Sequence, residues 1–323
     1  MDEQPVFVSG LYRSGTTLLT LILDQSKELK MSYDTIHYLR FIHGKHSVNK
    51  NSVKHILDDI NTRIIKRWNL KLDLDEILNK IITKNSFNHA TLYCEIMRSF
   101  LKLSKEVRWG DKTNVCWESI PDFLKMFPRG KVIHIYRDPR DVLASYKKFT
   151  NNPSNMYLDA VFASSAMFNY LNLQENPSNV FILKYEDLVS APEIYVKNIC
   201  NFLNLQFTNE MLMCRNFRQK DGNYFDSNSV FSGRRNTIDS NSVGIWKKEL
   251  SNLEIYLTEL INSDKMPVFG YKPQNVRLNN SELKQFDDLI TSEYLSPRYQ
   301  YWLNYKTGLQ AYPNDNLYNQ HIN

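Results

Sequence analysis

The most constraining feature of this sequence is a short apolar run that passes through a glycine-bounded turn into a second apolar run. Val6–Gly10 indicates a buried strand, and residues 16–25 indicate an almost wholly apolar helix. A helix that begins directly after such a turn presents unpaired backbone N–H groups and the positive end of its dipole, and both bind an anion. The sequence therefore predicts a phosphate-binding loop.

The spacing of this loop resembles a Walker A motif, but its ending differs. Gly10 and Gly15 have the Walker A spacing, whereas Thr16 and Thr17 stand where a Lys followed by Ser or Thr is expected. Arg13, inside the loop, supplies the positive charge. This pattern favours a nucleotide phosphate and disfavours ordinary ATP chemistry.

Length and composition set broad limits. A chain of 323 residues with 42% hydrophobic content can bury a large core, and we expect one domain over residues 1–323. The net charge of +5 suits an anionic ligand but is too small to indicate a nucleic-acid surface. No long apolar stretch or leader pattern stands out, so we expect no integral membrane segment and a cytoplasmic location. Four widely spaced cysteines, expected to be reduced, lack zinc-site spacing: Cys94, Cys116, Cys200 and Cys214.

The order of the predicted elements favours an α/β fold. Residues 132–136 and Val180–Lys184 are short β-branched runs, each followed by helical sequence, at residues 142–149 and 192–203. We therefore expect a three-layer, doubly wound, mainly parallel central sheet with a P-loop-like phosphate cradle. Three further regions are expected from their composition: a helical insert at about 51–105, a lid-like loop at about 218–248 and a wrapping tail at about 274–323.

Candidate ligand residues follow the predicted strands. Arg137 ends the second strand and Ser145 follows it by eight residues, while Tyr185 follows the third strand and could lie near a nucleotide base. Each has a structural alternative: Arg137 could pair with Asp138 or Asp141 on the surface, and Tyr185 could be a rim residue. Their shared position at strand ends favours a ligand site.

Together, three segments resemble the sulfotransferase family that uses 3′-phosphoadenosine 5′-phosphosulfate (PAPS). They begin at Gly10, at Arg137 and at Lys184, and the resemblance extends from Val6 to about Leu250. It implies that Arg13, Ser14, Gly15, Thr16 and Thr17 hold the 5′-phosphosulfate. It also implies that Arg137 and Ser145 hold the 3′-phosphate and that no metal is required.

The resemblance also suggests catalytic residues. Asp34 stands near the place of the catalytic Glu of glycan and tyrosyl-protein sulfotransferases, with His37, His43 and His46 as alternatives. Lys112 resembles the Lys that approaches the sulfonate, although it could simply pair with Asp111.

Two further features bear on the branch of the family and on the 3′-phosphate. Asn114 replaces the catalytic His of the cytosolic small-molecule branch, which favours the branch with a carboxylate base. Arg234 and Arg235, and to a lesser degree Lys247, lie in a segment like the one that closes on the 3′-phosphate.

We therefore expect an enzyme that moves a sulfuryl group from PAPS to a hydroxyl of a glycan or other hydroxylated metabolite, leaving the bisphosphate PAP. One alternative is a nucleotide-dependent kinase or NTPase, which would need Mg²⁺ but no 3′-phosphate site. Another is a non-catalytic nucleotide- or glycan-binding protein. The sequence indicates neither the acceptor nor the oligomeric state.

Overall fold

The computed structural model describes residues 3–150, 155–173, 178–214, 217, 238–313 and 317–320. The chain divides into two compact units. The first comprises Met1–Gly10, Gly15–Ile135 and Asn176–Ile238, and the second comprises Leu11–Ser14, Tyr136–Glu175 and Asp239–Asn323.

The first unit is built on a five-stranded sheet with the order β2-β3-β1-β4-β5. The pairs of β1 with β3, β1 with β4 and β2 with β3 are parallel. The strands are β1 (Val6–Gly10), β2 (Leu29–Tyr33), β3 (Arg108–Lys112), β4 (Lys131–Tyr136) and β5 (Val180–Lys184). The α/β fold with a parallel central sheet is thus confirmed.

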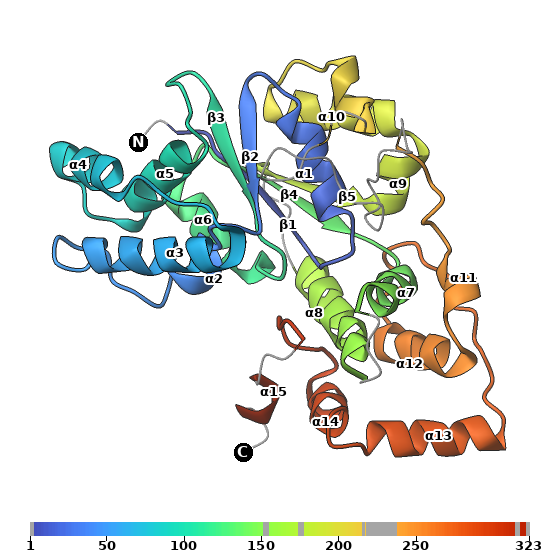
Figure 1. The fold of residues 1–323 in the computed structure, drawn as a ribbon. Helices are drawn as coiled ribbons and strands as arrows, with labels where there is room; N and C mark the ends of the chain where they lie inside the picture. The colour runs from blue at the N-terminus through green and yellow to red at the C-terminus, as the bar shows by residue number, and fades with distance from the viewer. Residues whose placement is uncertain are drawn as a thin grey trace. The chain divides into compact units, whose positions relative to one another are not determined.

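Helices cover both faces of this sheet (Figure 1). One face packs against α1 (Thr16–Asp24), α9 (Tyr185–Ser190) and α10 (Pro192–Leu203), and the other lies beside α5 (His89–Phe100) and α6 (Ile120–Met126). Successive side chains of β1 point to opposite faces of the sheet. Val6 and Val8 pack in the cluster that contains α1, whereas the ring of Phe7 lies 5.2 Å from that of Phe123. A strand buried on both faces explains the continuous apolar run at the start of the chain.

The expected helical insert is present. Its helices are α3 (Val53–Trp68), α4 (Leu74–Lys84) and α5, and α2 (Tyr38–Phe41) precedes them. Short 3₁₀ turns occur at Trp117–Ser119 and Asn209–Leu212. The four cysteines are free thiols and buried, as expected.

The regular structure of the second unit, in the part of the chain that the structure describes, is helical apart from Tyr136 at the end of β4. Its helices are α7 (Pro139–Thr150), α8 (Asp159–Leu173), α11 (Trp246–Glu249), α12 (Asn252–Asn262), α13 (Asn280–Ile290), α14 (Ser296–Tyr305) and α15 (Leu317–Gln320), with a 3₁₀ turn at Asn155–Leu158. The region expected to be a wrapping tail thus contains α13, α14 and α15. Most of the lid-like loop, residues 218–237, lies outside the described residues. Across the described chain, no helix is long and apolar enough to cross a membrane.

His134 of β4 gives the first unit a predictable response to acid. The side chain is fully buried, and burial lowers the pKa of His134 from 6.5 to about 3. Below pH 6.5 the unfolded chain therefore binds a proton that the folded chain does not, so the free energy of unfolding falls with pH until the folded pKa is reached.

We expect the free energy of unfolding to fall less steeply between pH 6 and 4 in His134→Asn than in the wild-type protein. The difference in slope should be up to about 1.4 kcal/mol per pH unit. Urea denaturation at several pH values measures this difference. Equal slopes for the wild-type protein and the variant would show that His134 titrates normally in the folded state.

Candidate active site

The loop between β1 and α1 has the backbone conformation of an anion cradle. Arg13 and Gly15 have positive φ angles of 65° and 93°. A Cβ atom on Gly15 would lie 2.3 Å from Cδ2 of Tyr185, so this position requires glycine both for its conformation and for the space. No described side chain caps the N-terminus of α1. The first-turn N–H groups of this helix are therefore available to a ligand.

Tyr185 begins α9, and its ring packs against the backbone of Gly15. The side chain is only 5% exposed. This position makes Tyr185 a support of the loop, while its contact with a nucleotide base stays a prediction.

The first turn of α1 is tied to the segment that follows β3. The Thr16 hydroxyl donates to Oδ1 of Asn114 at 2.8 Å, and the N–H of Val115 donates to the carbonyl oxygen of Gly10 at 3.0 Å. Thr17 lies in the same first turn and is half-buried. Asn114 therefore holds the start of α1 through its side chain in this structure.

Lys112 and Asp34 form an ion pair. Lys112 is the last residue of β3 and is fully buried, whereas the side chain of Asp34, which directly follows β2, is 25% exposed. The Lys112 ammonium donates to Oδ2 of Asp34, and the N–H of Asp34 donates to the carbonyl oxygen of Lys112 at 3.0 Å. The expected catalytic cation and the expected base are thus in contact, although 78 residues separate them.

Asp111, the other expected partner of Lys112, accepts a hydrogen bond of 2.6 Å from the Tyr93 hydroxyl. Successive residues of a strand point to opposite faces of the sheet, which explains why these neighbours have different partners. The structure thus shows Lys112 paired with Asp34.

The three histidines considered as alternative bases differ in their surroundings. His37 is buried, and its ring lies 5.6 Å from that of Phe41 in an edge-on arrangement. Nδ1 of His43 lies 3.6 Å from Asp122. His46 is half-buried. None of these contacts involves Lys112, whereas Asp34 pairs with it.

In the second unit, three of the predicted nucleotide ligands lie together. Nε of Arg13 donates to the Ser145 hydroxyl at 3.0 Å, and Nη1 of Arg137 donates to the carbonyl oxygen of Arg13 at 3.1 Å. The guanidinium of Arg13 also lies 4.8 Å from the centre of the Phe149 ring. The Arg13 guanidinium thus contacts the Ser145 hydroxyl, and the Arg137 guanidinium contacts the backbone of Arg13. Guanidinium and hydroxyl groups are donors suited to a phosphate.

Arg137 is held by buried partners and is not part of a solvated surface cluster. Only 4% of Arg137 and 1% of Asp141 are exposed, and their side chains lie 3.8 Å apart. Arg137 also donates through Nη2 to the carbonyl oxygen of Ser242. Asp138 pairs instead with Arg140, through contacts of 3.0 and 2.7 Å.

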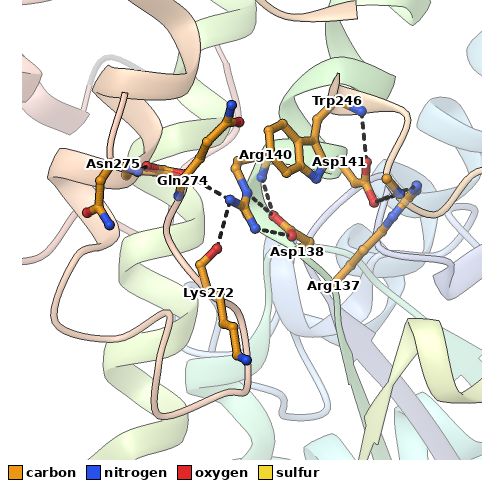
Figure 2. Close-up of polar contacts among 10 residues, drawn as sticks. Arg137, Asp138, Arg140, Asp141, Trp246, Lys272, Gln274 and Asn275 are labelled. Carbon is orange, nitrogen blue, oxygen red and sulfur yellow. Dashed lines mark hydrogen bonds and ion pairs between the residues drawn. The ribbon is translucent and has the colours of Figure 1, made fainter. Parts of the chain in front are cut away.

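Asp141 and Trp246 belong to the same network. The sequence offered Asp141 only as a surface partner of Arg137, and it did not indicate the bonds of Asp141 to the backbone or the role of Trp246. The Asp141 carboxylate accepts the N–H of Gly244 at 2.7 Å and that of Trp246 at 3.1 Å (Figure 2). Burial raises the pKa of Asp141, while Arg137 and these two N–H groups oppose the rise. The available sequence signal was an acid four residues after Arg137, in the segment that runs from the end of β4 into α7.

Arg234 and Arg235 lie outside the described residues. Lys247 is exposed, and its ammonium lies 5.7 Å from the Trp246 ring. Within the described ranges, no group of three or more His, Cys, Asp or Glu side chains could hold a metal ion.

Comparisons with known proteins identify the family and support the fold. The model of the sulfotransferase family matches residues 5–209. A putative protein-tyrosine sulfotransferase of Caenorhabditis briggsae is 24% identical over 256 residues, covering 76% of this chain and 81% of that protein. Cytosolic sulfotransferase 7 of Arabidopsis thaliana is 28% identical over 116 residues, which cover 30% of this chain and 35% of that protein.

Among solved structures, the sulfotransferase domain from the Synechococcus PCC 7002 olefin synthase superposes with a TM-score of 0.51. It is 23% identical and covers 81% of this chain and 96% of that chain, so it supports the fold. The family match extends over more than half of the sequence, from the first strand through the phosphate loop, Lys112, Arg137 and Ser145. This chain is a member of the sulfotransferase family.

Proposed function

We propose that the protein transfers a sulfuryl group from PAPS to the hydroxyl of an acceptor. The observation that carries the proposal is the contact among Arg13, Ser145 and Arg137. In this proposal Arg137 and Ser145 bind the 3′-phosphate beside the loop residue Arg13, and a kinase needs no such site because its nucleotide lacks a 3′-phosphate. We further propose that both units belong to one sulfotransferase domain, since the family match includes residues of each.

The residues of the loop fit a phosphosulfate ligand. Ser14 is fully buried, and its hydroxyl makes no hydrogen bond to any described residue, which is unusual for a buried polar atom. Arg13 contributes a positive charge, and the start of α1 contributes N–H groups. PAPS, when bound, supplies an activated sulfuryl group attached to a phosphate leaving group.

Lys112 and Asp34 would provide charge stabilisation and proton removal. The Lys112 ammonium, fixed at the end of β3, offers positive charge toward a leaving group that becomes more negative as transfer proceeds. Asp34 would accept the proton of the acceptor hydroxyl. Because the two groups are paired, the carboxylate is held in place before an acceptor arrives.

The acceptor is proposed to be a glycan or another hydroxylated metabolite. A carboxylate at position 34 and an amide at position 114 favour the branch of the family that acts on sugars or tyrosyl residues. Tyrosyl peptides therefore belong in the same test, as the name of the Caenorhabditis briggsae relative also suggests.

A transfer assay with radiolabelled PAPS tests this proposal. Glycans, tyrosyl peptides and small alcohols are offered separately, with EDTA present, and labelled products are separated by chromatography. We expect label in one of these classes and its loss in Asp34→Asn, which keeps the size of the side chain but cannot accept the proton. Tight PAP binding without transfer to any acceptor would instead support a non-catalytic nucleotide-binding protein.

A further inference from the structure

The buried carboxylate of Asp141 links the segment Ser242–Trp246 to Arg137. Asp141 accepts two backbone N–H groups of this segment and also faces Arg137, whose Nη2 donates to the carbonyl oxygen of Ser242. The guanidinium is therefore bracketed by a side chain of α7 and by the backbone of the segment (Figure 2).

The segment has little freedom to take another position. Gly244 has a φ of 74°, which favours glycine, and the Trp246 side chain is only 6% exposed. The Trp246 indole packs with Ala144 and Ile255, and the Arg140 guanidinium lies 4.0 Å from the centre of its ring. Trp246 is thus held through its backbone by Asp141 and through its ring by Arg140.

We propose that Asp141 is a positioning residue that orients Arg137 toward the 3′-phosphate of the nucleotide. This inference rests on the proposed function, in which Arg137 holds that phosphate. A long guanidinium side chain has many rotamers, and a buried carboxylate that is itself fixed by two N–H groups restricts them. Because Asp141 already restricts the side chain, Arg137 loses less conformational entropy when it binds the phosphate.

Asp141→Asn isolates this role, because asparagine has the same shape but only one acceptor oxygen. Its NH₂ group would replace either Oδ1, which accepts the N–H of Trp246, or Oδ2, which accepts the N–H of Gly244 and faces Arg137. At least one of the present contacts must then be lost, and the negative charge beside Arg137 is removed in both cases. We expect the Kd for PAP to rise about tenfold and the Kd for adenosine 5′-monophosphate, which lacks the 3′-phosphate, to stay nearly constant.

The readout is the ratio of the two dissociation constants, measured by calorimetry. A purely structural role of Asp141 would lower the melting temperature without changing this ratio. Asp138→Asn is the matched control, since it makes the same change in the same motif at a residue that pairs with Arg140. It should lower stability and leave the ratio unchanged.

Gly244→Ala provides a second variant should Asp141→Asn fold poorly. Among the described residues, no atom lies within 4 Å of a Cβ at this position, so the substitution strains the backbone without a clash with them. Gly244→Ala disturbs the backbone N–H that donates to Asp141, whereas Asp141→Asn changes the acceptor of the same hydrogen bond. We expect both variants to weaken PAP binding relative to the binding of adenosine 5′-monophosphate.

A double-mutant cycle with Arg137→Ala completes the test. If Asp141 acts through Arg137, then Asp141→Asn has no further effect on the ratio once Arg137 is absent. The inference would be overturned if a folded Asp141→Asn protein had the wild-type ratio of the two dissociation constants. It would also be overturned if Asp141→Asn weakened PAP binding, relative to that of adenosine 5′-monophosphate, equally with and without Arg137. A wild-type protein that binds both nucleotides equally would overturn the 3′-phosphate role of Arg137 itself, and the inference with it.

Discussion

Replacing Lys112 with alanine should lower kcat by at least about a thousandfold while changing the Kd for PAP by less than about threefold. Lys112 is fully buried at the end of β3, in contact with Asp34. Its charge would stabilise the leaving group, which becomes most negative in the transition state. PAP, the product, carries no sulfuryl group and should lose little when this ammonium is absent.

The variant Lys112→Met separates charge from packing. Methionine keeps most of the volume of the buried lysine stem but has no positive charge. We expect it to be nearly as inactive as the alanine variant and more stable in thermal denaturation. A methionine variant with near-normal kcat would show that Lys112 has only a structural role. A Kd for PAP that rises in proportion to the loss of kcat/KM would show that Lys112 only binds the nucleotide.

Removing Arg140 should produce a large loss of stability in the second unit. Arg140 is 4% exposed and bonds both Asp138 and Glu259, the latter at 2.7 Å from α12. Glu259 also accepts the N–H groups of Gln274 and Asn275 at 2.8 and 2.9 Å (Figure 2). Arg140→Ala leaves two buried carboxylates without their shared cation, and we expect a cost of about 3–5 kcal/mol in the free energy of unfolding.

Chemical denaturation of Arg140→Ala measures this cost, and an exposed ion pair supplies the control. Lys197 and Glu193 pair at 2.6 Å with side chains 50% and 61% exposed. Lys197→Ala should therefore change the free energy of unfolding by less than about 1 kcal/mol. Similar losses for the two variants would contradict the dominant role assigned to the buried network.

The sequence predicted the strands that have an apolar pattern and missed those that do not. β1, β4 and β5 were expected from their runs of apolar residues, α1 was expected as an almost wholly apolar helix, and α10 was expected as the helix after β5. All are confirmed. β3 was missed, because Arg108–Lys112 contains two basic residues, an acid and a glycine. Burial of Asp111 and Lys112 depends on partners supplied by Tyr93 and Asp34, which local propensity does not reveal.

The same distinction holds for the site. The phosphate loop is local in sequence and was predicted with its bounds, whereas the contacts of Lys112 with Asp34 and of Arg13 with Ser145 join residues 78 and 132 positions apart. Such contacts depend on the order of the strands in the sheet and on helix packing. The parallel pairing of β2 with β3 brings Tyr33 opposite Lys112, and Asp34 follows directly.

Calorimetric titration of the protein with PAP in EDTA, compared with ATP in the presence of Mg²⁺, distinguishes a PAPS-dependent sulfotransferase from a kinase. A PAPS-dependent sulfotransferase should bind PAP without metal, with a Kd in the micromolar range or below, which corresponds to about −8 kcal/mol or better. It should bind ATP with Mg²⁺ at least about a hundredfold more weakly, because that nucleotide has no 3′-phosphate for Arg137 and Ser145. Tight binding of ATP that requires Mg²⁺, with no detectable binding of PAP, would contradict the account and identify a kinase or NTPase instead.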